Sequence, residues 1–226
     1  MKMTTKKQPK NEEEKLKSRL SRTRTIGNLY NKKYKILPIE GIWKEVLGDI
    51  EATGCWLIFG NDKNGKSRLA LSLAKYLSFS NRILYISAEE GESLNFRNMC
   101  QWAGFMPNDR KFHIKEYIDI NELKERLTAR NAPNIVFIDN ITFYHDELKY
   151  GGVRNLLNDF RKTIFVFIAH EQMGEPYTST AKMVKKLATA IMYVQGLRCH
   201  ISGRVSGGIL DIDVEKAQIF HGSKNN

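Results

Sequence analysis

The fold is decided by the stretch Trp56-Leu-Ile-Phe-Gly60-Asn-Asp-Lys-Asn-Gly65-Lys66-Ser67. An apolar run ends at Gly60, a short polar loop follows, and Gly65-Lys66-Ser67 begins a helical pattern. This is the spacing G-x-x-x-x-G-K-[ST], with a strand before the loop and a helix after it. Glycine lets a backbone curl round an anion, and the N–H groups at a helix start attract its charge. The stretch therefore predicts a phosphate-binding loop.

Each residue of this loop has an expected place in the site. Lys66 should reach the β- and γ-phosphates of a nucleoside triphosphate, and the Ser67 hydroxyl should hold Mg²⁺. The cofactors predicted from the loop are therefore ATP and Mg²⁺. The residues expected to surround the phosphates are Gly60, Asn61, Asp62, Lys63, Asn64, Gly65, Lys66, Ser67 and Arg68.

The composition is that of one domain with a basic tail. The chain has 226 residues, and its 42% of hydrophobic residues can build a sizeable core. Cys55, Cys100 and Cys199 form no C-x-x-C pair, so neither a zinc site nor a disulfide framework is expected. No apolar run approaches the ~18 residues of a membrane span, and no apolar signal core begins the chain. We therefore expect a cytoplasmic protein that does not contact membranes.

The positive charge is concentrated at the N-terminus. Residues 1–35 hold twelve of the 36 basic residues but three of the 25 acidic ones, which accounts for most of the net charge of +11. We therefore divide the chain into a basic arm, residues 1–35, with a transient helix at 12–19, and a domain, residues 36–226. Such an arm can bind nucleic acid by releasing counterions, or it can be a solvated, disordered leader.

From residue 56 onward, apolar strand-like runs alternate with helical patterns. This alternation predicts an α/β fold with a mostly parallel, twisted sheet and helices on both faces. The expected strands are residues 56–59, 83–87, 112–114, 135–139, 164–169 and 191–194. The expected helices are a short one around Trp43 and longer ones at residues 66–78, 93–103, 120–130, 153–160 and 180–188. Short runs at 198–201, 209–214 and 218–221, joined by glycine-rich turns, predict an antiparallel extension.

Polar side chains follow several of these strands at the edge where an open α/β sheet binds its ligands. Glu89 and Glu90 follow residues 83–87, Asp139 ends residues 135–139, and His170 follows residues 164–169. Phosphoryl transfer to water needs a metal ligand, a group that orients the water and a γ-phosphate sensor. We assign these roles to Asp139, Glu89 and His170, respectively.

Each assignment has an alternative. Asp139 could instead cap a helix N-terminus, because Asn140 and Thr142 follow it. Glu90 competes with Glu89 for the water, and Glu89 is preferred because it lies nearer the strand end. His170 could be a capping residue without a catalytic part.

Two segments beside this edge are candidate contact surfaces. Residues 171–186 contain a loop with Gly174 and Pro176, which could carry a nucleotide signal. The basic residues that follow it, Lys182, Lys185 and Lys186, could contact a phosphodiester backbone or could form a solvated helix face. Residues 140–150 are expected to form a second loop, in which Phe143 and Tyr144 could stack on bases or pack in the core.

The run Ile83-Leu-Tyr-Ile-Ser-Ala-Glu89-Glu-Gly-Glu-Ser resembles the second-strand segment of RecA-type P-loop ATPases, closest to their RadA/Sms and DnaB-like branches. Residues 135–142 resemble the Walker B strand of this family, and residues 164–170 resemble the strand that ends in its His/Gln switch. The resemblance covers roughly residues 42–221. It implies a RecA-like core, ATP with Mg²⁺, a ring or filament of identical subunits, and usually DNA as the partner.

The resemblance also implies that a neighbouring subunit completes the site with basic residues from a late hairpin. Arg204 is the matching candidate for an arginine finger, although Ser202 stands where a lysine is common in the family. RadA-type proteins also carry a zinc-binding N-terminus and a C-terminal protease-like domain, and neither has a match in this sequence; the resemblance therefore extends to the ATPase core alone.

These observations favour an oligomeric ATPase that acts with DNA, single-stranded DNA preferred, in replication, recombination or repair. The alternative is a nucleotide-gated protein-interaction module, such as a helicase loader or a KaiC-like regulator. A small-molecule kinase fits less well, because carboxylates at two strand ends and a switch histidine suit water activation better than an acceptor pocket.

Overall fold

The computed structural model describes residues 23–222. The chain divides into two units, Met1–Tyr34 and Lys35–Asn226. In the first unit the described residues form a short helix, α2 (Ile26–Tyr30), which Thr25 caps by accepting a hydrogen bond from the Asn28 N–H at 3.3 Å. The predicted helix at residues 12–19 and most of the predicted basic arm lie outside the described residues.

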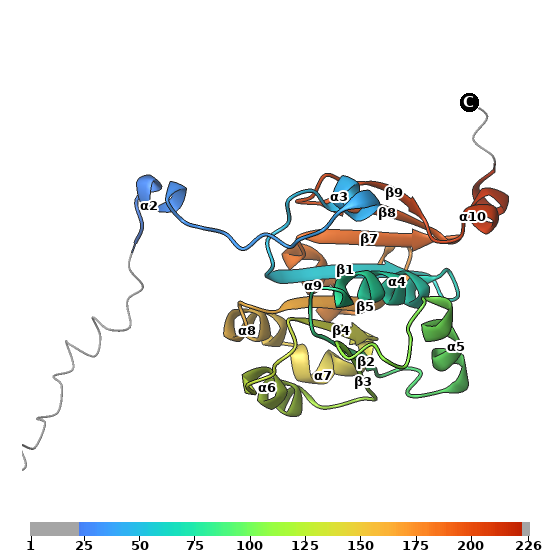
Figure 1. The fold of residues 1–226 in the computed structure, drawn as a ribbon, viewed down its shortest axis with the longest axis horizontal. Helices are drawn as coiled ribbons and strands as arrows, with labels where there is room; N and C mark the ends of the chain where they lie inside the picture. Colours follow the sequence, from blue (N-terminus) through green and yellow to red (C-terminus); the bar gives the residue numbers. More distant parts are fainter. Residues whose placement is uncertain (1–22, 223–226) are drawn as a thin grey trace, which may run out of the picture. The chain divides into compact units, whose positions relative to one another are not determined.

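A mixed, mostly parallel sheet forms the centre of the second unit, as predicted (Figure 1). Its strand order is β3-β2-β4-β5-β1-β7-β8-β9. The strands from β3 to β7 pair in parallel, and β8 and β9 add the antiparallel extension. The bounds are β1 Gly54–Gly60, β2 Ile83–Ser87, β3 Phe112–Lys115, β4 Ile135–Asp139, β5 Ile164–Gln172, β7 Ala190–Gln195, β8 Arg198–Gly203 and β9 Gly208–Asp211. A two-residue strand, β6 (Glu175–Pro176), pairs with the end of β5.

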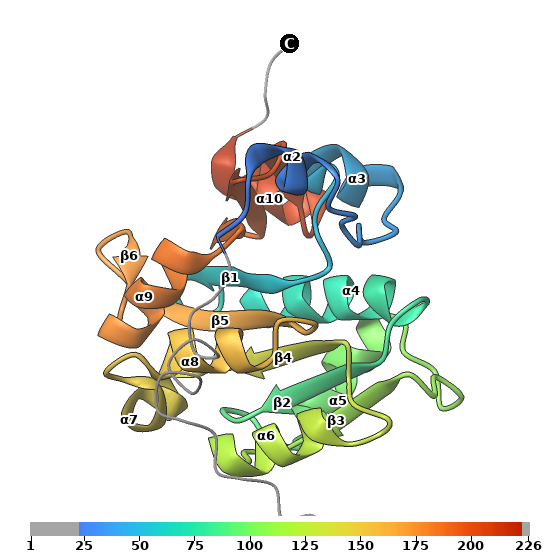
Figure 2. The same cartoon turned by 90° about the vertical axis from the view of Figure 1, so that its left-hand side faces the viewer.

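Helices cover both faces of the sheet (Figure 2). One face carries α3 (Gly41–Leu47), α4 (Lys66–Ser78) and α5 (Leu94–Trp102). The other carries α6 (Ile120–Thr128), α7 (His145–Leu148), α8 (Gly152–Asp159) and α9 (Ser179–Leu187). A 3₁₀ turn, η1 (Ile141–Tyr144), precedes α7, and α10 (Val214–His221) follows β9.

Alternation along β1 explains how one strand serves two cores. Trp56 and Ile58 point into the core beneath α4, whereas Cys55, Leu57 and Phe59 point into the core beneath α9. Because successive side chains of a strand face opposite sides, a strand buried on both faces must be apolar throughout.

The structure corrects three predictions. Residues 218–221 belong to helix α10, not to a strand; Asp213 caps this helix by accepting from the Lys216 N–H at 3.2 Å, which lets the helix-favouring residues that follow continue the turn. The predicted strand at residues 209–214 ends early, at Asp211, because α10 begins soon after it. Residues 140–150 form η1 and α7, not an open loop, because Asn140 Oδ1 accepts from the Thr142 N–H at 2.9 Å and starts the turn.

The cysteines and the absence of membrane segments can also be checked. Cys55 and Cys199 are buried and Cys100 is partly buried; all three are free thiols. Within residues 23–222, no helix has the length and apolar character needed to cross a membrane.

Phe137 tests the packing of the central sheet. Its side chain is fully buried on β4 and stacks on Tyr85 with ring centroids 5.5 Å apart. We expect Phe137→Ala to lower the free energy of unfolding by ~3–5 kcal/mol, measured by urea denaturation, because it leaves a cavity between packed rings. Leu94→Ala, at a residue that is 63% exposed, is the control and should change it by less than ~0.5 kcal/mol. Equal losses in the two variants would contradict the packing.

Candidate functional site

Parallel pairing brings the predicted residues to one edge of the sheet. In the register of the strands, Gly60 at the end of β1 lies beside His170 on β5, and Ser87 at the end of β2 lies beside Asp139 on β4. The same edge holds a cavity of about 650 Å³. It is lined by Asp62, Lys63, Gly65, Lys66, Ser67, Arg68, Glu89, Glu90, Asn95, Met99, Asp139, His170, Leu197 and Lys216.

The loop that opens the cavity depends on two glycines. Gly65 has φ +103° and directly precedes α4, in a conformation that side chains rarely adopt. A Cβ on Gly60 would lie 2.1 Å from the carbonyl oxygen of Val194 on the neighbouring strand β7, so only glycine fits. The loop therefore has the backbone form that the sequence pattern predicted, with its N–H groups next to a helix N-terminus.

Lys66 is held inside this loop. Its side chain is 8% exposed, and its Nζ donates to the Asn61 carbonyl oxygen at 2.8 Å. The same Nζ lies 3.6 Å from Asp62 Oδ1. The ammonium is thus placed over the concave side of the loop, where a phosphate would take over its hydrogen bonds.

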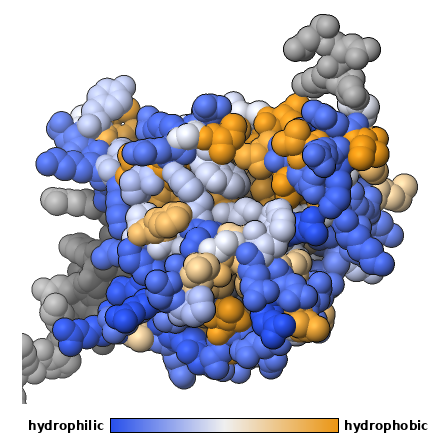
Figure 3. Space-filling model, turned by 45° about the vertical axis from the view of Figure 1, so that its right-hand side comes forward, coloured by the Kyte–Doolittle hydropathy of each residue, from blue (hydrophilic) through white to orange (hydrophobic). Residues whose placement is uncertain are grey.

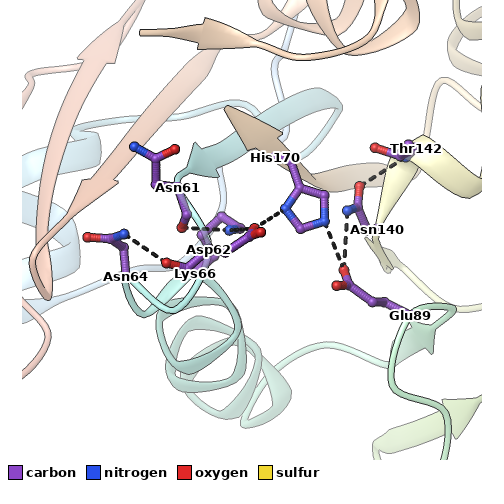
Figure 4. Close-up of polar contacts among 8 residues, drawn as sticks. All are labelled: Asn61, Asp62, Asn64, Lys66, Glu89, Asn140, Thr142 and His170. Carbon is purple, nitrogen blue, oxygen red and sulfur yellow. Dashed lines mark hydrogen bonds and ion pairs between the residues drawn. The ribbon is translucent and has the colours of Figure 1, made fainter. Parts of the chain in front are cut away.

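His170 links the loop to the second strand (Figure 4). Its Nδ1 lies 2.5 Å from Asp62 Oδ1, and its Nε2 lies 3.2 Å from Glu89 Oε2. Asn140 Nδ2 donates to the same Glu89 oxygen at 3.2 Å. The imidazole therefore lies between two carboxylates, one from the phosphate loop and one from the end of β2.

The charges of this network support one another. The hydrogen bond to Glu89 raises the pKa of His170, and the same bond lowers the pKa of Glu89. The contribution of Glu89 to stability is therefore lost as the pH falls through its lowered pKa, and that of His170 is lost as the pH rises through its raised pKa. The ion pair is strongest in the pH window between the lowered pKa of Glu89 and the raised pKa of His170.

Asp139 ends β4, and a cis peptide bond joins it to Asn140. It is 8% exposed, and burial raises its pKa to about 6. The Tyr85 hydroxyl donates to its Oδ2 at 2.7 Å, and Ser67 also hydrogen-bonds its carboxyl, both of which favour the charged form. Because the folded-state pKa lies above the ordinary value of 3.8, this group favours the fold at low pH and that contribution is lost as the pH rises through about 6.

Ser67 and Asp139 suit Mg²⁺ as a pair. Magnesium prefers oxygen ligands and usually keeps waters, taking one or two carboxylates plus phosphate oxygens of a substrate. The Ser67 hydroxyl and the buried Asp139 carboxyl provide that partial set of ligands. Among residues 23–222, no cluster of three or more His, Cys, Asp and Glu side chains could hold a metal by itself.

Of two further predicted residues, Glu90 lies in the cavity and Arg204 lies outside it. Glu90 lines the cavity, but its Oε2 accepts from Asn95 Nδ2 at 2.9 Å, whereas Glu89 contacts His170. Arg204 is exposed and follows β8, and its N–H donates to the Thr189 carbonyl at 2.8 Å, beside the start of β7. Arg204 is thus at the opposite edge of the sheet from its own phosphate loop, and its role in a neighbouring subunit stays a prediction.

The structure adds residues that sequence reasoning missed. Tyr85 lies in an apolar strand and has the pattern of a core residue, so the sequence did not indicate that its hydroxyl contacts the site. Asn140 follows Asp139, the predicted metal ligand, at a position where the sequence suggested only a helix cap or a loop. Lys216 reaches the cavity from α10, a segment that was predicted to contain a strand.

Comparison with solved structures agrees with this geometry. The flagellar accessory protein FlaH from Methanocaldococcus jannaschii superposes with a TM-score of 0.58 and 16% sequence identity, over 79% of this chain and 92% of that chain. The fold is RecA-like. Folds of this P-loop class generally bind nucleotides. No protein-family model matches the sequence, and no curated protein matches it.

Tyr85→Phe tests the electrostatics of the predicted metal carboxylate. Loss of the phenolic hydrogen bond should raise the pKa of Asp139 above about 6, because that bond stabilises the carboxylate. The measurement is a ¹³C NMR titration of the Asp139 carboxyl without nucleotide. Tyr117→Phe, whose hydroxyl bonds Glu147, is the control. An unchanged or lower pKa in Tyr85→Phe would contradict the account.

Proposed function

We propose that the protein binds ATP with Mg²⁺ and hydrolyses it. The observation that carries the proposal is the convergence of Lys66, Glu89, Asp139 and His170 on one cavity, from four segments far apart in the sequence. A phosphate-binding turn without hydrolysis would need Lys66 and the loop, but not a carboxylate–histidine pair opposite them.

Each side chain has a task in this reaction. Lys66 binds the phosphate oxygens and neutralises charge that develops on them. Glu89 accepts a hydrogen bond from the attacking water and orients it, while its own charge is kept by His170 and Asn140. Mg²⁺ held by Ser67 and Asp139 would supply charge neutralisation between the outer phosphates.

His170 connects the reaction to the surface. It lies within β5, which continues to Gln172 and turns back through β6 into α9. A phosphate that replaced Asp62 as the partner of Nδ1 would change the charge facing this strand. The hairpin and α9 are therefore the elements that would carry the nucleotide state outward.

We propose further that the protein works as a homo-oligomer, with Arg204 acting in the site of a neighbour, and that it acts with DNA. The candidate contact residues beyond His170 are exposed: Lys182 and Lys186 on α9, Met173 (96% exposed), Tyr177 (55%) and Phe143 (53%). Tyr144 and Lys185 are unsuited to this role, because Tyr144 is buried and donates to the Ile118 carbonyl, and Lys185 pairs with Glu175 at 2.8 Å. The RadA/Sms and DnaB-like branch rests on the sequence resemblance alone.

A second candidate is a nucleotide-gated protein-interaction module. The likeness to FlaH, described as a flagellar accessory protein, favours it. In such a module ATP controls assembly with a protein partner, and DNA has no effect on turnover.

Asp62 provides a test of nucleotide binding. Its carboxylate lies beside Lys66 and His170, where it would repel a γ-phosphate. Two unit charges ~4 Å apart near a surface interact by ~4 kcal/mol, but Asp62 is 74% exposed and solvent screens much of this. We expect Asp62→Asn to bind MgATP about tenfold more tightly by calorimetry. Asp49→Asn, at a residue with 75% exposure outside the cavity, is the matched control; weaker binding by Asp62→Asn would contradict the geometry.

Turnover tests the proposed reaction. Lys66→Ala should abolish MgATP binding, whereas Glu89→Gln should bind MgATP and lose turnover by at least ~100-fold, the usual scale of a general base. Single-stranded DNA should raise the turnover of the wild type, and ATP should raise its particle mass.

The outcomes separate the candidates. Turnover that survives in Glu89→Gln but not in Glu90→Gln would assign the water to Glu90. An ATP-dependent particle mass with no response of turnover to any nucleic acid would favour the interaction module. Absence of turnover in the wild type under every condition would refute hydrolysis.

A further inference from the structure

The tip of the phosphate loop is tied to the turn between β7 and β8. Asn64 Oδ1 accepts a hydrogen bond from the Gly196 N–H at 2.6 Å, and the Asn64 carbonyl accepts one from the Leu197 N–H at 3.1 Å. Asn64 Nδ2 donates back to the Asp62 carbonyl at 3.0 Å. The side chain that the sequence pattern assigned to phosphate contact is thus engaged on both sides by backbone groups.

The turn is packed tightly against the loop on one side and α10 on the other. Gly196 has φ +51° and Leu197 has φ +60°. A Cβ on Gly65 would lie 2.6 Å from Leu197 Cδ2, and a Cβ on Gly196 would lie 2.1 Å from Phe220 Cδ1. The Phe220 ring therefore rests directly on the glycine whose N–H holds Asn64.

Helix α10 is itself fixed to the turn. His221 Nε2 donates to the Gln195 carbonyl at 2.9 Å, and Asp213 caps the other end of the helix. Phe220 and His221 therefore contact the chain at Gly196 and Gln195, where β7 enters the turn, and the turn holds Asn64.

We propose that α10 keeps the phosphate loop in its nucleotide-binding conformation, through Phe220, the β7–β8 turn and Asn64. Asn64 and Phe220 are positioning residues in this account. A nest of backbone N–H groups binds an anion well only if the groups already point inward, since ordering a free loop would subtract from affinity. The inference rests on the proposed function, because it concerns the same site.

The outer face of α10 supplies a matched control. Apolar side chains gather around this helix (Figure 3). A hollow of about 310 Å³ lies between α10 and the loop, and both Ile219 and Phe220 line it. Ile219 is 83% exposed, whereas the ring of Phe220 covers Gly196. Ile219→Ala removes a similar apolar side chain without loosening the turn.

The experiment is a double-mutant cycle on MgATP affinity. Asn64→Ala and Phe220→Ala should each raise Kd about tenfold, the scale of one well-placed hydrogen bond or its support. Because both act through the same turn, the double variant should also show about a tenfold rise, and not the ~100-fold product expected of independent sites. Ile219→Ala should stay within about twofold of the wild type, and Phe220→Leu should recover most of the affinity. Turnover at saturating MgATP should stay within about twofold of the wild type in Phe220→Ala and Ile219→Ala, which separates loss of positioning from loss of catalysis.

Hydrogen exchange of the loop amides, residues 61–66, gives a readout that needs no nucleotide. These amides should exchange faster in Asn64→Ala and Phe220→Ala than in Ile219→Ala, at matched thermal stability. Wild-type affinity in both variants, or effects that multiply in the double variant, would overturn the proposal. If the wild type does not bind MgATP, the proposed function fails. The positioning role is refuted separately, if the loop amides of Asn64→Ala and Phe220→Ala exchange no faster than those of Ile219→Ala.

Discussion

The site depends on the parallel pairing of β5 with both β1 and β4. This register places Gly60 beside His170 and puts Asp139 on the adjoining strand. Strands that are buried on both faces cannot slip without exposing apolar side chains, so the packing of the sheet fixes the positions of the polar groups that follow its strands. The phosphate loop, the carboxylates and the histidine are close together because the hydrophobic core holds these strands in one register.

Charge balance then defines the state of the site. The cavity holds one buried carboxyl, Asp139, and one imidazole between two carboxylates, with the buried ammonium of Lys66 beside them. The buried carboxyl has a raised pKa and the imidazole is stabilised as a cation. Such an arrangement is suited to bind an anion together with a cation, because the anion can contact the Lys66 ammonium while the cation contacts the Asp139 carboxyl.

Most of the fold could be predicted from the sequence, because long apolar runs and a 3.6-residue periodicity are strong signals. Helix α4 and strands β2 and β4 have the predicted bounds. Residues 218–221 could not be assigned correctly, because a short apolar run fits a strand and a helix equally and the Asp213 cap lies outside it. Residues 140–150 were missed for a related reason: Ile141, Tyr144 and Leu148 repeat at helical spacing, but the repeat is too short to exclude a loop, and one Asn140 hydrogen bond starts the turn. Within the site, loop residues and strand ends could be placed, whereas Tyr85 and α10 act through tertiary contacts that no local pattern encodes.

The central claim is that Lys66, Glu89, Asp139 and His170 surround one triphosphate. The most direct measurement is a crystal structure of the full chain with Mg²⁺ and a non-hydrolysable ATP analogue. We expect the γ-phosphate to lie between Lys66 and His170, displacing Asp62, with the metal on Ser67 and Asp139. An analogue bound with its γ-phosphate outside this cavity, or with Glu89 turned away from it, would contradict the account.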